Sequence, residues 1–310
     1  MTSAGLQVYA SLALGIVFAA AGGELFVRSA VRLARAARVS GAIIGATVAA
    51  FATSSPELAV AINAAIEQRP QIALGDALGS NVVNVALILG IALLISPIQS
   101  PRGSVKRDFP MALAVPVVTA FLCFDGVLSR IEGALLLGLF LAWLAAVIAD
   151  ARRQRSSSEA AAAPPVSGAA ALGVVGLVLL IAAGILIVAG ARGIAESFGI
   201  TEFAIGATIV AIGTSVPELV TAVIAKLRGH DEIGLGTVLG SNIFNGLWIV
   251  PVAAVIYPIG FDLREVAVAL GAGVFAMLAV FPPAHGLIGR GRGAMLMAVY
   301  AGYVGAILVW

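Results

Sequence analysis

The chain repeats itself at an interval of 161 residues. Residues 45–64 read GATVAAFATSSPELAVAINA, and residues 206–225 read GATIVAIGTSVPELVTAVIA. The match runs on from IALGDALGSNVVN at 72–84 to IGLGTVLGSNIFN at 233–245, and nineteen of the forty positions in 45–84 are identical in 206–245. Apolar segments share Leu, Ala and Val by chance, but they do not share TSxPE and LGSNxxN in register. The fold must therefore contain two related halves.

The repeated segments lie in a chain that is too apolar for a water-soluble domain. Hydrophobic residues make up 61% of it, charged residues only 11%, and the mean hydropathy is +1.08. Soluble domains carry about 25% charged residues. This composition excludes disordered, collagen-like, disulfide-stapled and nucleic-acid-binding proteins, and it indicates an integral membrane protein whose surroundings are the lipid bilayer. Since no basic residue precedes Arg28, we expect the first apolar stretch to be retained as a helix.

Apolar runs of about 17–25 residues predict transmembrane helices. Ten such runs are present, at 6–27, 40–65, 71–97, 109–124, 131–149, 168–190, 201–225, 233–257, 265–281 and 294–310. The connections between them alternate in charge, because fourteen of the eighteen Lys and Arg lie in 28–39, 98–108, 150–167, 226–232 and 282–293. Basic loops stay in the cytoplasm. We therefore expect a multi-pass protein of the inner (plasma) membrane with both termini outside the cytoplasm.

The repeat interval spans five predicted helices, and an odd number inverts the second copy relative to the first. The sequence thus predicts an all-α membrane protein of about ten transmembrane helices, built as two inverted five-helix repeats. The first repeat is 1–149, a cytoplasmic linker is 150–167, and the second repeat is 168–310. Inverted repeats are typical of secondary transporters, which hold their substrate between the repeats near the bilayer midplane.

Two carboxylates lie deep inside predicted helices, Glu57 in the second and Glu218 in the seventh. A charge at the bilayer centre costs at least about 2.5–3.5 kcal/mol, so such residues mark functional sites. Each follows a Thr-Ser pair and a proline, Pro56 or Pro217. Proline removes a backbone donor and kinks or breaks a helix, and polar backbone at this depth is tolerated where it lines a cavity. We therefore expect discontinuous helices at a central site rich in oxygen ligands.

The second motif adds further oxygens one predicted helix later. Ser80 and Asn84 are four residues apart, as are Ser241 and Asn245, so each pair shares a helix face. No His or Cys accompanies these residues, which argues against zinc or copper and favours Ca²⁺ or Na⁺. Two negative charges match one divalent ion or two monovalent ions, and this equivalence is a physical basis for exchange at a shared site.

These residues resemble the cation/Ca²⁺ exchanger superfamily, and specifically its prokaryotic sodium/calcium exchangers. The family signature is a GTSxPE helix followed by a GSNxxN or GSNxxD helix, present twice in inverted copies, and the resemblance covers the whole chain. It implies an antiporter, not an enzyme, with no cofactor, which exchanges Na⁺ for Ca²⁺ by alternating access and functions as a monomer. It also implies that the first and sixth helices slide across the others.

The resemblance further implies a set of ion ligands. Glu57 and Glu218 would form the central site, with the carbonyls of Thr53 and Thr214 joining them around Ca²⁺. The Na⁺ ligands would be completed by residues of both motifs and by two backbone carbonyls. These are Ser54, Ser215, Ser80, Ser241, Asn84 and Asn245, with the carbonyls of Ala50 and Ala211.

Three positions depart from the family pattern. Asn245 stands where relatives often carry Asp, and because a carboxylate there is associated with K⁺ co-transport, Asn245 favours potassium independence. Ala52 replaces the usual Gly, which makes the approach to Thr53 bulkier than the approach to Thr214. Asp76 stands where many relatives have Asn, and we expect it to cap the third predicted helix or to place a charge near the path of the ions.

Two alternatives keep this fold and change the ions, namely a Ca²⁺/H⁺ antiporter and a K⁺-dependent Na⁺/Ca²⁺ exchanger. Burial can raise the pKa of a carboxylate enough for proton coupling, but the hydroxyls and amides beside the two glutamates favour an alkali ion. An intramembrane hydrolase would need a His-containing or Asp-Asp constellation that the predicted helices lack. A channel would more naturally place rings of ligands in a symmetric oligomer.

Overall fold

The computed structural model describes residues 3–157, 167–195 and 206–309, and this part of the chain is almost entirely helical. The first half contains α1 Ser3–Ala37, α2 Gly41–Ile44, η1 Gly45–Ala49, α3 Ala50–Thr53, α4 Ser55–Ile66, α5 Pro70–Val82, η2 Val83–Leu89, α6 Gly90–Ile95, β1 Ile98–Gln99, α7 Arg102–Lys106, α8 Asp108–Leu122, η3 Cys123–Asp125, β2 Val127–Leu128 and α9 Arg130–Ser157. The second half contains α10 Ser167–Ala195, η5 Gly206–Val210, α12 Ala211–Thr214, α13 Val216–Leu227, α14 Asp231–Phe244, η6 Asn245–Ile249, α15 Val250–Ile256, β3 Ile259–Gly260, α16 Leu263–Val280, β4 Leu287–Ile288 and α17 Arg290–Val309.

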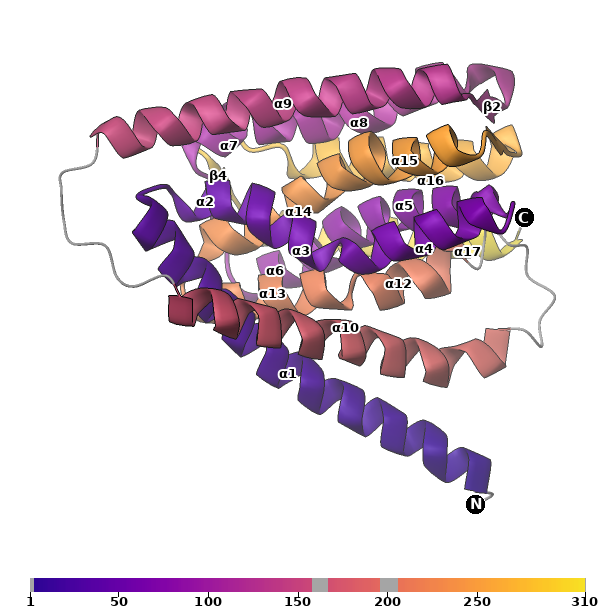
Figure 1. The fold of residues 1–310 in the computed structure, drawn as a ribbon, viewed down its shortest axis with the longest axis horizontal. Helices are drawn as coiled ribbons and strands as arrows, with labels where there is room; N and C mark the ends of the chain where they lie inside the picture. Colours follow the sequence, from indigo (N-terminus) through magenta and orange to yellow (C-terminus); the bar gives the residue numbers. More distant parts are fainter. Residues whose placement is uncertain (1–2, 158–166, 196–205, 310) are drawn as a thin grey trace.

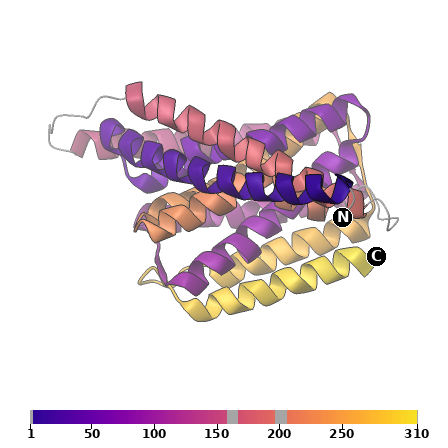
Figure 2. The ribbon, with the colours of Figure 1, turned by 90° about the horizontal axis from the view of Figure 1, so that it is seen from below.

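The helices form one bundle in which equivalent elements of the two halves recur at the interval of the sequence repeat. The π-helix η1, helix α3 and helix α4 have counterparts of the same length in η5, α12 and α13, each 161 residues later. Helices α1 and α10 lie side by side along one side of the bundle (Figures 1 and 2), and the view of Figure 2 shows α17, in yellow, on the opposite side. The pairing of α1 with α10 brings together the first helix of each half.

Four two-residue strands, which the sequence did not reveal, tie the halves together. Strand β1 pairs antiparallel with β4, with Ile98 opposite Ile288, and β2 pairs antiparallel with β3, with Leu128 opposite Ile259. Strands β1 and β3 occupy equivalent places in the repeat, yet their partners β4 and β2 lie at opposite ends of the molecule (Figure 1). Equivalent parts of the two halves therefore point toward opposite ends.

The two helices that carry the glutamates are broken just before them. Ser54 separates α3 from α4 with φ −84° and ψ 12°, and Ser215 separates α12 from α13 with φ −81° and ψ 6°. A proline lies in the first turn of α4 and of α13, where its missing N–H costs no helical hydrogen bond. Each helix after the break has only 12 residues, or about 18 Å. Neither crosses a bilayer as one continuous helix.

Three continuous helices in the described part of the chain are long and apolar enough to cross a membrane. They are Pro70–Ile95, Arg130–Gln154 and Asp231–Ile256, and a fourth crossing is formed if Ala21–Ala37 and Gly41–Thr53, which meet at 120°, count as one bent span. The helical fold agrees with the expectation, whereas the full set of ten crossings stays a prediction. Residues 201–205 of the seventh predicted helix lie outside the described residues.

The centre of the bundle is built from α5–η2–α6 and α14–η6–α15, whose apolar windows are 78% buried, against 28% for α9. Glycine lets these helices approach the π-helices of the other half. A Cβ atom at Gly79 would overlap the carbonyl oxygen of Ala207, and one at Gly240 would lie 2.6 Å from that of Ala46. Small residues at helix crossings have this role in membrane proteins, and here they bring each LGSN motif against the π-helix that precedes the opposite TSxPE motif.

Two helices extend furthest beyond their expected bounds. Helix α1 continues to Ala37, so the expected loop 28–39 is wrong over most of its length, and α9 continues to Ser157 into the expected linker 150–167. Apolar length predicts where a helix is covered by lipid, but a polar helix end continues when its charges find partners, as Arg28 does with Glu24 one turn earlier. The remainder of the linker, residues 158–166, lies outside the described residues.

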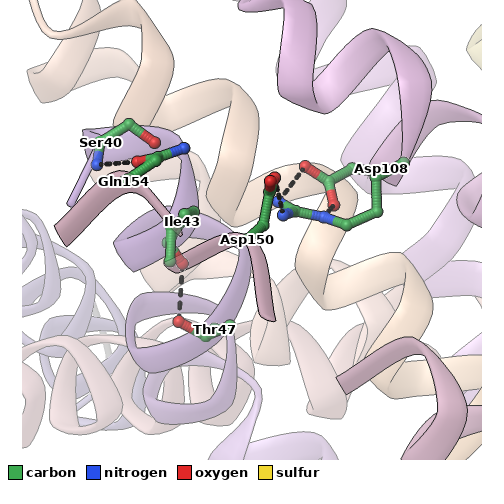
Figure 3. Close-up of polar contacts among 7 residues, drawn as sticks. Ser40, Ile43, Thr47, Asp108, Asp150 and Gln154 are labelled. Atoms are coloured by element: carbon green, nitrogen blue, oxygen red, sulfur yellow. Dashed lines mark hydrogen bonds and ion pairs between the residues drawn. The ribbon is translucent and has the colours of Figure 1, made fainter. Parts of the chain in front are cut away.

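The extended end of α9 fixes two neighbouring segments. Arg107 pairs with both Asp108, which begins α8, and Asp150 in α9, at N–O distances of 2.8 Å each. One turn further on, Gln154 Oε1 accepts the backbone N–H of Ser40 at 2.8 Å, immediately before α2 (Figure 3). The end of α9 therefore holds the start of α8 and the turn between α1 and α2 in place.

Candidate ion-binding site

All twelve residues predicted as ion ligands are buried in the middle of the bundle. The two glutamates, Asn84 and Asn245 have no exposed surface. Thr214 is the most exposed residue of the set, at 8%. They come from the breaks at Ser54 and Ser215, from the helices on either side of those breaks, and from α5–η2 and α14–η6. Both halves contribute the same kinds of residue.

Serine hydroxyls from both halves meet at Glu218. Ser54 of the first half donates its hydroxyl to Glu218 Oε1 at 3.1 Å, and Ser241 donates to the same oxygen at 3.0 Å. The two serine oxygens are also 3.0 Å apart. This triangle shows that the break in the first half and the LGSN motif of the second half converge on one carboxylate.

Glu57 has the equivalent place in the first half but different contacts. Its counterpart serines are Ser215 and Ser80, and Ser80 Oγ lies 3.4 Å from both the Ala211 carbonyl and Thr214 Oγ1 instead. Within the described part of the chain, neither carboxylate oxygen of Glu57 meets a hydrogen-bond donor, and Ser215 Oγ has no partner. A buried carboxylate without donors is costly unless a cation compensates it.

A network of four asparagine side chains links α5–η2 to α14–η6. Asn84 Nδ2 donates to Asn242 Oδ1 at 3.0 Å, and Asn245 Nδ2 donates to Asn81 Oδ1 at 3.1 Å. Asn242 Nδ2 in turn donates to the Asn81 backbone carbonyl at 3.2 Å. Because Asn84 and Asn245 use their NH₂ groups on the opposite half, each keeps its carbonyl oxygen available as an acceptor. Asn81 and Asn242 thus position the two predicted ligands. The prediction from sequence omitted these two residues, although each is the Asn of an LGSN motif.

Among the predicted ligands, the side-chain atoms without partners are carboxylate, amide and hydroxyl oxygens. Six oxygens of predicted ligands are buried and unpaired among the described residues: Glu57 Oε1 and Oε2, Glu218 Oε2, Asn84 Oδ1, Asn245 Oδ1 and Ser215 Oγ. Natural proteins pair the great majority of buried polar atoms. A cluster of carboxylate, amide and hydroxyl oxygens without hydrogen-bond donors is suited to a hard cation such as Ca²⁺ or Na⁺, which takes oxygen ligands.

Asp76 is a third buried carboxylate at this site, and its expected role as a helix-terminal residue is wrong. Helix α5 begins at Pro70, which places Asp76 well inside the helix, where it is 1% exposed. Its Oδ1 accepts the hydroxyl of Thr214 at 3.0 Å. Asp76, Ser80 and Asn84 are spaced by four and share one face of the helix, so Asp76 continues the row of predicted ligands by one turn.

The carboxylates act here together with neutral oxygens and not as a dense acidic cluster. In the part of the chain that the structure describes, no group of three or more His, Cys, Asp and Glu is arranged to hold a metal ion. Among the ion pairs of the described residues, none involves Glu57, Glu218 or Asp76. The buried Lys226 instead binds Asp231 and the Pro97 carbonyl, at 2.9 Å and 2.7 Å.

The extra methyl group of Ala52 leaves the first break unchanged. The backbone angles at Ser54 and Ser215 agree within a few degrees, although Ala52 precedes one break and Gly213 the other. The preceding threonines also behave alike, since Thr53 donates to the Ala49 carbonyl at 3.0 Å and Thr214 to the Val210 carbonyl at 3.1 Å. The departure of Ala52 from the family motif therefore does not distort the helix around Thr53.

Comparison with known proteins agrees with this arrangement. The family model described as sodium/calcium exchanger protein matches twice, at residues 8–149 and 168–309. Among curated relatives, the sodium/calcium exchanger MaX1 of Methanosarcina acetivorans is 34% identical over 94% of this chain and 96% of its own. The inner membrane protein YrbG of Escherichia coli is 33% identical over 82% of this chain and 81% of its own.

The fold is also similar to a solved one. A structure of the sodium-calcium exchanger NCX_Mj, soaked with Na⁺ and Sr²⁺, superposes with a TM-score of 0.83 at 30% identity, over 97% of this chain and 98% of that one. The repeated motifs, the broken helices that carry both glutamates, the family match and this likeness agree. The chain belongs to the sodium/calcium exchanger protein family.

Proposed function

We propose that the protein is a secondary active antiporter that exchanges Na⁺ for Ca²⁺ and uses the inward Na⁺ gradient to expel Ca²⁺. The observation that carries this proposal is the set of six unpaired acceptor oxygens, which two carboxylates, two amides and a hydroxyl contribute from both halves. Calcium takes six to eight oxygen ligands. The two negative charges of the glutamates are balanced by one Ca²⁺ or by two Na⁺. The same residues can therefore bind both ions in turn.

The surroundings of the glutamates favour Na⁺ over H⁺ as the driving ion. A proton relay requires the carboxylates alone, whereas hydroxyl and amide oxygens that are oriented toward a carboxylate are ligands for an alkali ion. Asn84 and Asn245 bind the opposite half through their NH₂ groups, so their amide oxygens are unpaired and available as ligands. A Ca²⁺/H⁺ antiporter on the same fold is the second candidate, since the buried Glu57 and Glu218 lack a neighbouring Lys or Arg partner among the described ion pairs.

Asn245 favours an exchange that does not require K⁺. It supplies a neutral amide oxygen at a place where an Asp would add a further carboxylate to those of Glu57, Glu218 and Asp76. Its NH₂ group donates to Asn81 at 3.1 Å, so only its oxygen is available as a ligand. A K⁺-dependent exchanger is the alternative.

We infer the membrane arrangement from the charge pattern and the repeat. The two halves, 1–149 and 168–310, are inverted repeats of five transmembrane helices each, and the linker 150–167 and the other basic loops face the cytoplasm. The opposite placement of the equivalent strands β1 and β3 supports the inversion. Both termini then lie outside the cytoplasm, and the protein works as a monomer in the inner (plasma) membrane. The inner-membrane name of the relative YrbG is consistent with that location.

The test is Ca²⁺ uptake into liposomes that contain the purified protein. An outward Na⁺ gradient is compared with a matched outward H⁺ gradient at clamped membrane potential, each with and without K⁺. We expect uptake with the Na⁺ gradient only, at the same rate with and without K⁺. Uptake driven only by H⁺ would replace the sodium assignment with the proton alternative, and uptake that requires K⁺ would overturn the interpretation of Asn245.

A further inference from the structure

Helix α17 reaches the backbone of the second broken helix through one side chain. Tyr303, which is 3% exposed, donates its hydroxyl to the carbonyl oxygen of Ala207 at 3.0 Å. Ala207 is the second residue of the π-helix η5, which leads into α12 and the break at Ser215. The last helix of the chain thus binds a carbonyl in the segment that precedes Glu218.

A π-helical turn has a particular use for such a donor. Its N–H groups bond to the carbonyl five residues earlier instead of four, so one carbonyl is left without an N–H where the turn joins an α-helix. After η5 the α-helical pattern returns, since the Ser215 N–H donates to the Ala211 carbonyl at 3.1 Å. Buried carbonyls are normally paired, and no water replaces a missing donor inside a bilayer. The Tyr303 hydroxyl therefore favours the π-helical register of η5.

The position of Ala207 affects ligands of both halves. Ala211 and Thr214 follow four and seven residues later, so a change of register in η5 would shift the helix α12 that carries them. On the other side, a Cβ atom at Gly79 of α5 would overlap the Ala207 carbonyl oxygen. The next residue, Ser80, has its Oγ 3.4 Å from both the Ala211 carbonyl and Thr214 Oγ1. A shift of Ala207 would therefore change the spacing between the predicted ligands of α5 and α12.

A second tyrosine in α17 provides a natural comparison. Tyr300 lies one turn before Tyr303, and its buried hydroxyl has no partner among the described residues. In the first half, the residue equivalent to Tyr303 is Ala142 in α9, which has no hydroxyl. The contact with η5 is therefore specific to Tyr303 and is not a general property of tyrosine in this helix.

We propose that Tyr303 is a positioning residue for the ion ligands: its hydrogen bond to Ala207 fixes the π-helical register of η5. That register keeps the Ala211 carbonyl and the Thr214 hydroxyl at their distances from Ser80. The role rests on the proposed Na⁺/Ca²⁺ exchange, and it concerns both ions because the same residues are the predicted ligands of both. Tyr303 acts through the backbone of η5.

The test compares Tyr303→Phe with Tyr300→Phe in liposomes. Each variant removes one buried hydroxyl from α17 and keeps the ring, but only Tyr303→Phe removes a hydrogen bond to η5. We expect Tyr303→Phe to raise the half-saturating concentrations of Na⁺ and Ca²⁺ about fivefold, the equivalent of one hydrogen bond. Its maximal rate should stay within about twofold of wild type, and Tyr300→Phe should stay within about twofold in all three values.

A merely structural role for Tyr303 predicts a different result. Loss of folded protein would lower the maximal rate and leave the half-saturating concentrations unchanged. That pattern, or an equal effect of the two variants, would overturn the positioning role. Hydrogen exchange is the second readout: the backbone amides of 206–214 should exchange faster in Tyr303→Phe than in Tyr300→Phe or wild type, and equal exchange would show that Tyr303 does not fix the register.

The Ca²⁺ value is measured as Ca²⁺/Ca²⁺ exchange without Na⁺, which separates this inference from the proposed function. If wild type exchanges Ca²⁺ but shows no response to Na⁺, the proposed Na⁺ coupling fails. The role of Tyr303 is then still decided by the half-saturating Ca²⁺ concentration and by hydrogen exchange.

Discussion

Glu57 and Glu218 occupy equivalent positions in two copies of one motif, yet the serine hydroxyls around them are arranged differently. Glu218 Oε1 accepts hydrogen bonds from Ser54 and Ser241, while neither oxygen of Glu57 meets a donor among the described residues. The residue types that could serve Glu57 are present, but Ser80 is directed elsewhere and Ser215 Oγ has no partner. Two copies of one motif thus form one carboxylate with two hydroxyl donors on one of its oxygens and one carboxylate without a donor on either oxygen. Inequality in the site arises from the direction of hydroxyl groups as much as from residue type.

Removing the negative charge of either glutamate is expected to have the largest effect. We expect Glu57→Gln and Glu218→Gln each to lower Ca²⁺ transport at least about a hundredfold, because a single remaining carboxylate cannot balance a divalent ion in a buried site. Liposome uptake measures the loss. Without ions, Glu57→Gln should raise the melting temperature more than Glu218→Gln, since both oxygens of Glu57 but only one of Glu218 lack donors. A monodisperse elution profile is the control for folding, and wild-type transport by either variant would remove that glutamate from the site.

The asparagine network offers a second, smaller perturbation. Asn242→Ala removes the acceptor that holds the NH₂ group of Asn84, so the amide of Asn84 can turn and its oxygen is no longer directed as a ligand. Losing one such bond of about 1 kcal/mol should raise the half-saturating concentrations of Na⁺ and Ca²⁺ roughly fivefold. Asn81→Ala is the matched variant, because it releases Asn245 in the same way. Unchanged values in both variants would show that the network has no part in orienting the ligands.

The serines at the two helix breaks are expected to differ in how much they contribute to the stability of the protein. Ser54→Ala removes a hydroxyl bound to both Glu218 and Ser241, whereas Ser215→Ala removes one without a partner. In ion-free detergent solution, Ser54→Ala should lower the free energy of unfolding by about 1–2 kcal/mol and Ser215→Ala by less than about 0.5 kcal/mol. Thermal unfolding of both variants side by side checks this order. An equal decrease would mean that the contacts of Ser54 contribute nothing specific.

The smallest effect is expected where the two motifs differ in sequence. Ala52→Gly makes the first motif identical to the second at this position, but the backbone at Ser54 already matches that at Ser215. We expect transport within about twofold of wild type, with a stability loss of up to about 1 kcal/mol from the added backbone freedom. Uptake kinetics of this single variant suffice as the measurement. A large change in ion affinity would show that the Ala52 methyl group shapes the site after all.

The site was more predictable from the sequence than the details around it. Polar residues repeated at a fixed interval in apolar segments are costly to bury unless they serve a shared site, and all twelve predicted ligands are indeed buried. Their roles as ligands remain predictions. Asp76 escaped this reasoning because it has no counterpart in the second copy, where Thr237 stands. A helix terminus could not be distinguished from a helix interior there, since prolines and charges mark boundaries only to within a few residues.

The connecting structure was least predictable. Strands of two residues have no periodicity to detect, and their pairing depends on where distant segments meet. The polar ends of α1 and α9 were predicted to be loops, because the bounds of the helices were predicted from the length of the apolar runs alone. The partners that extend them, such as Asp150 for Arg107, lie far apart in the sequence.

The crossed pairing of the four strands bears on how such a chain could originate. Each half has one strand at each end, and each pairs with the strand of the other kind from the opposite half: β1 with β4, and β2 with β3. Two copies of a single half, related by a twofold axis, would present the same two pairings. The surface between the halves is therefore self-complementary, as in a twofold dimer. A gene for one half could have supplied both partners before duplication and fusion joined them, and the two halves, expressed as separate chains, already carry the matching edges by which they would reassemble.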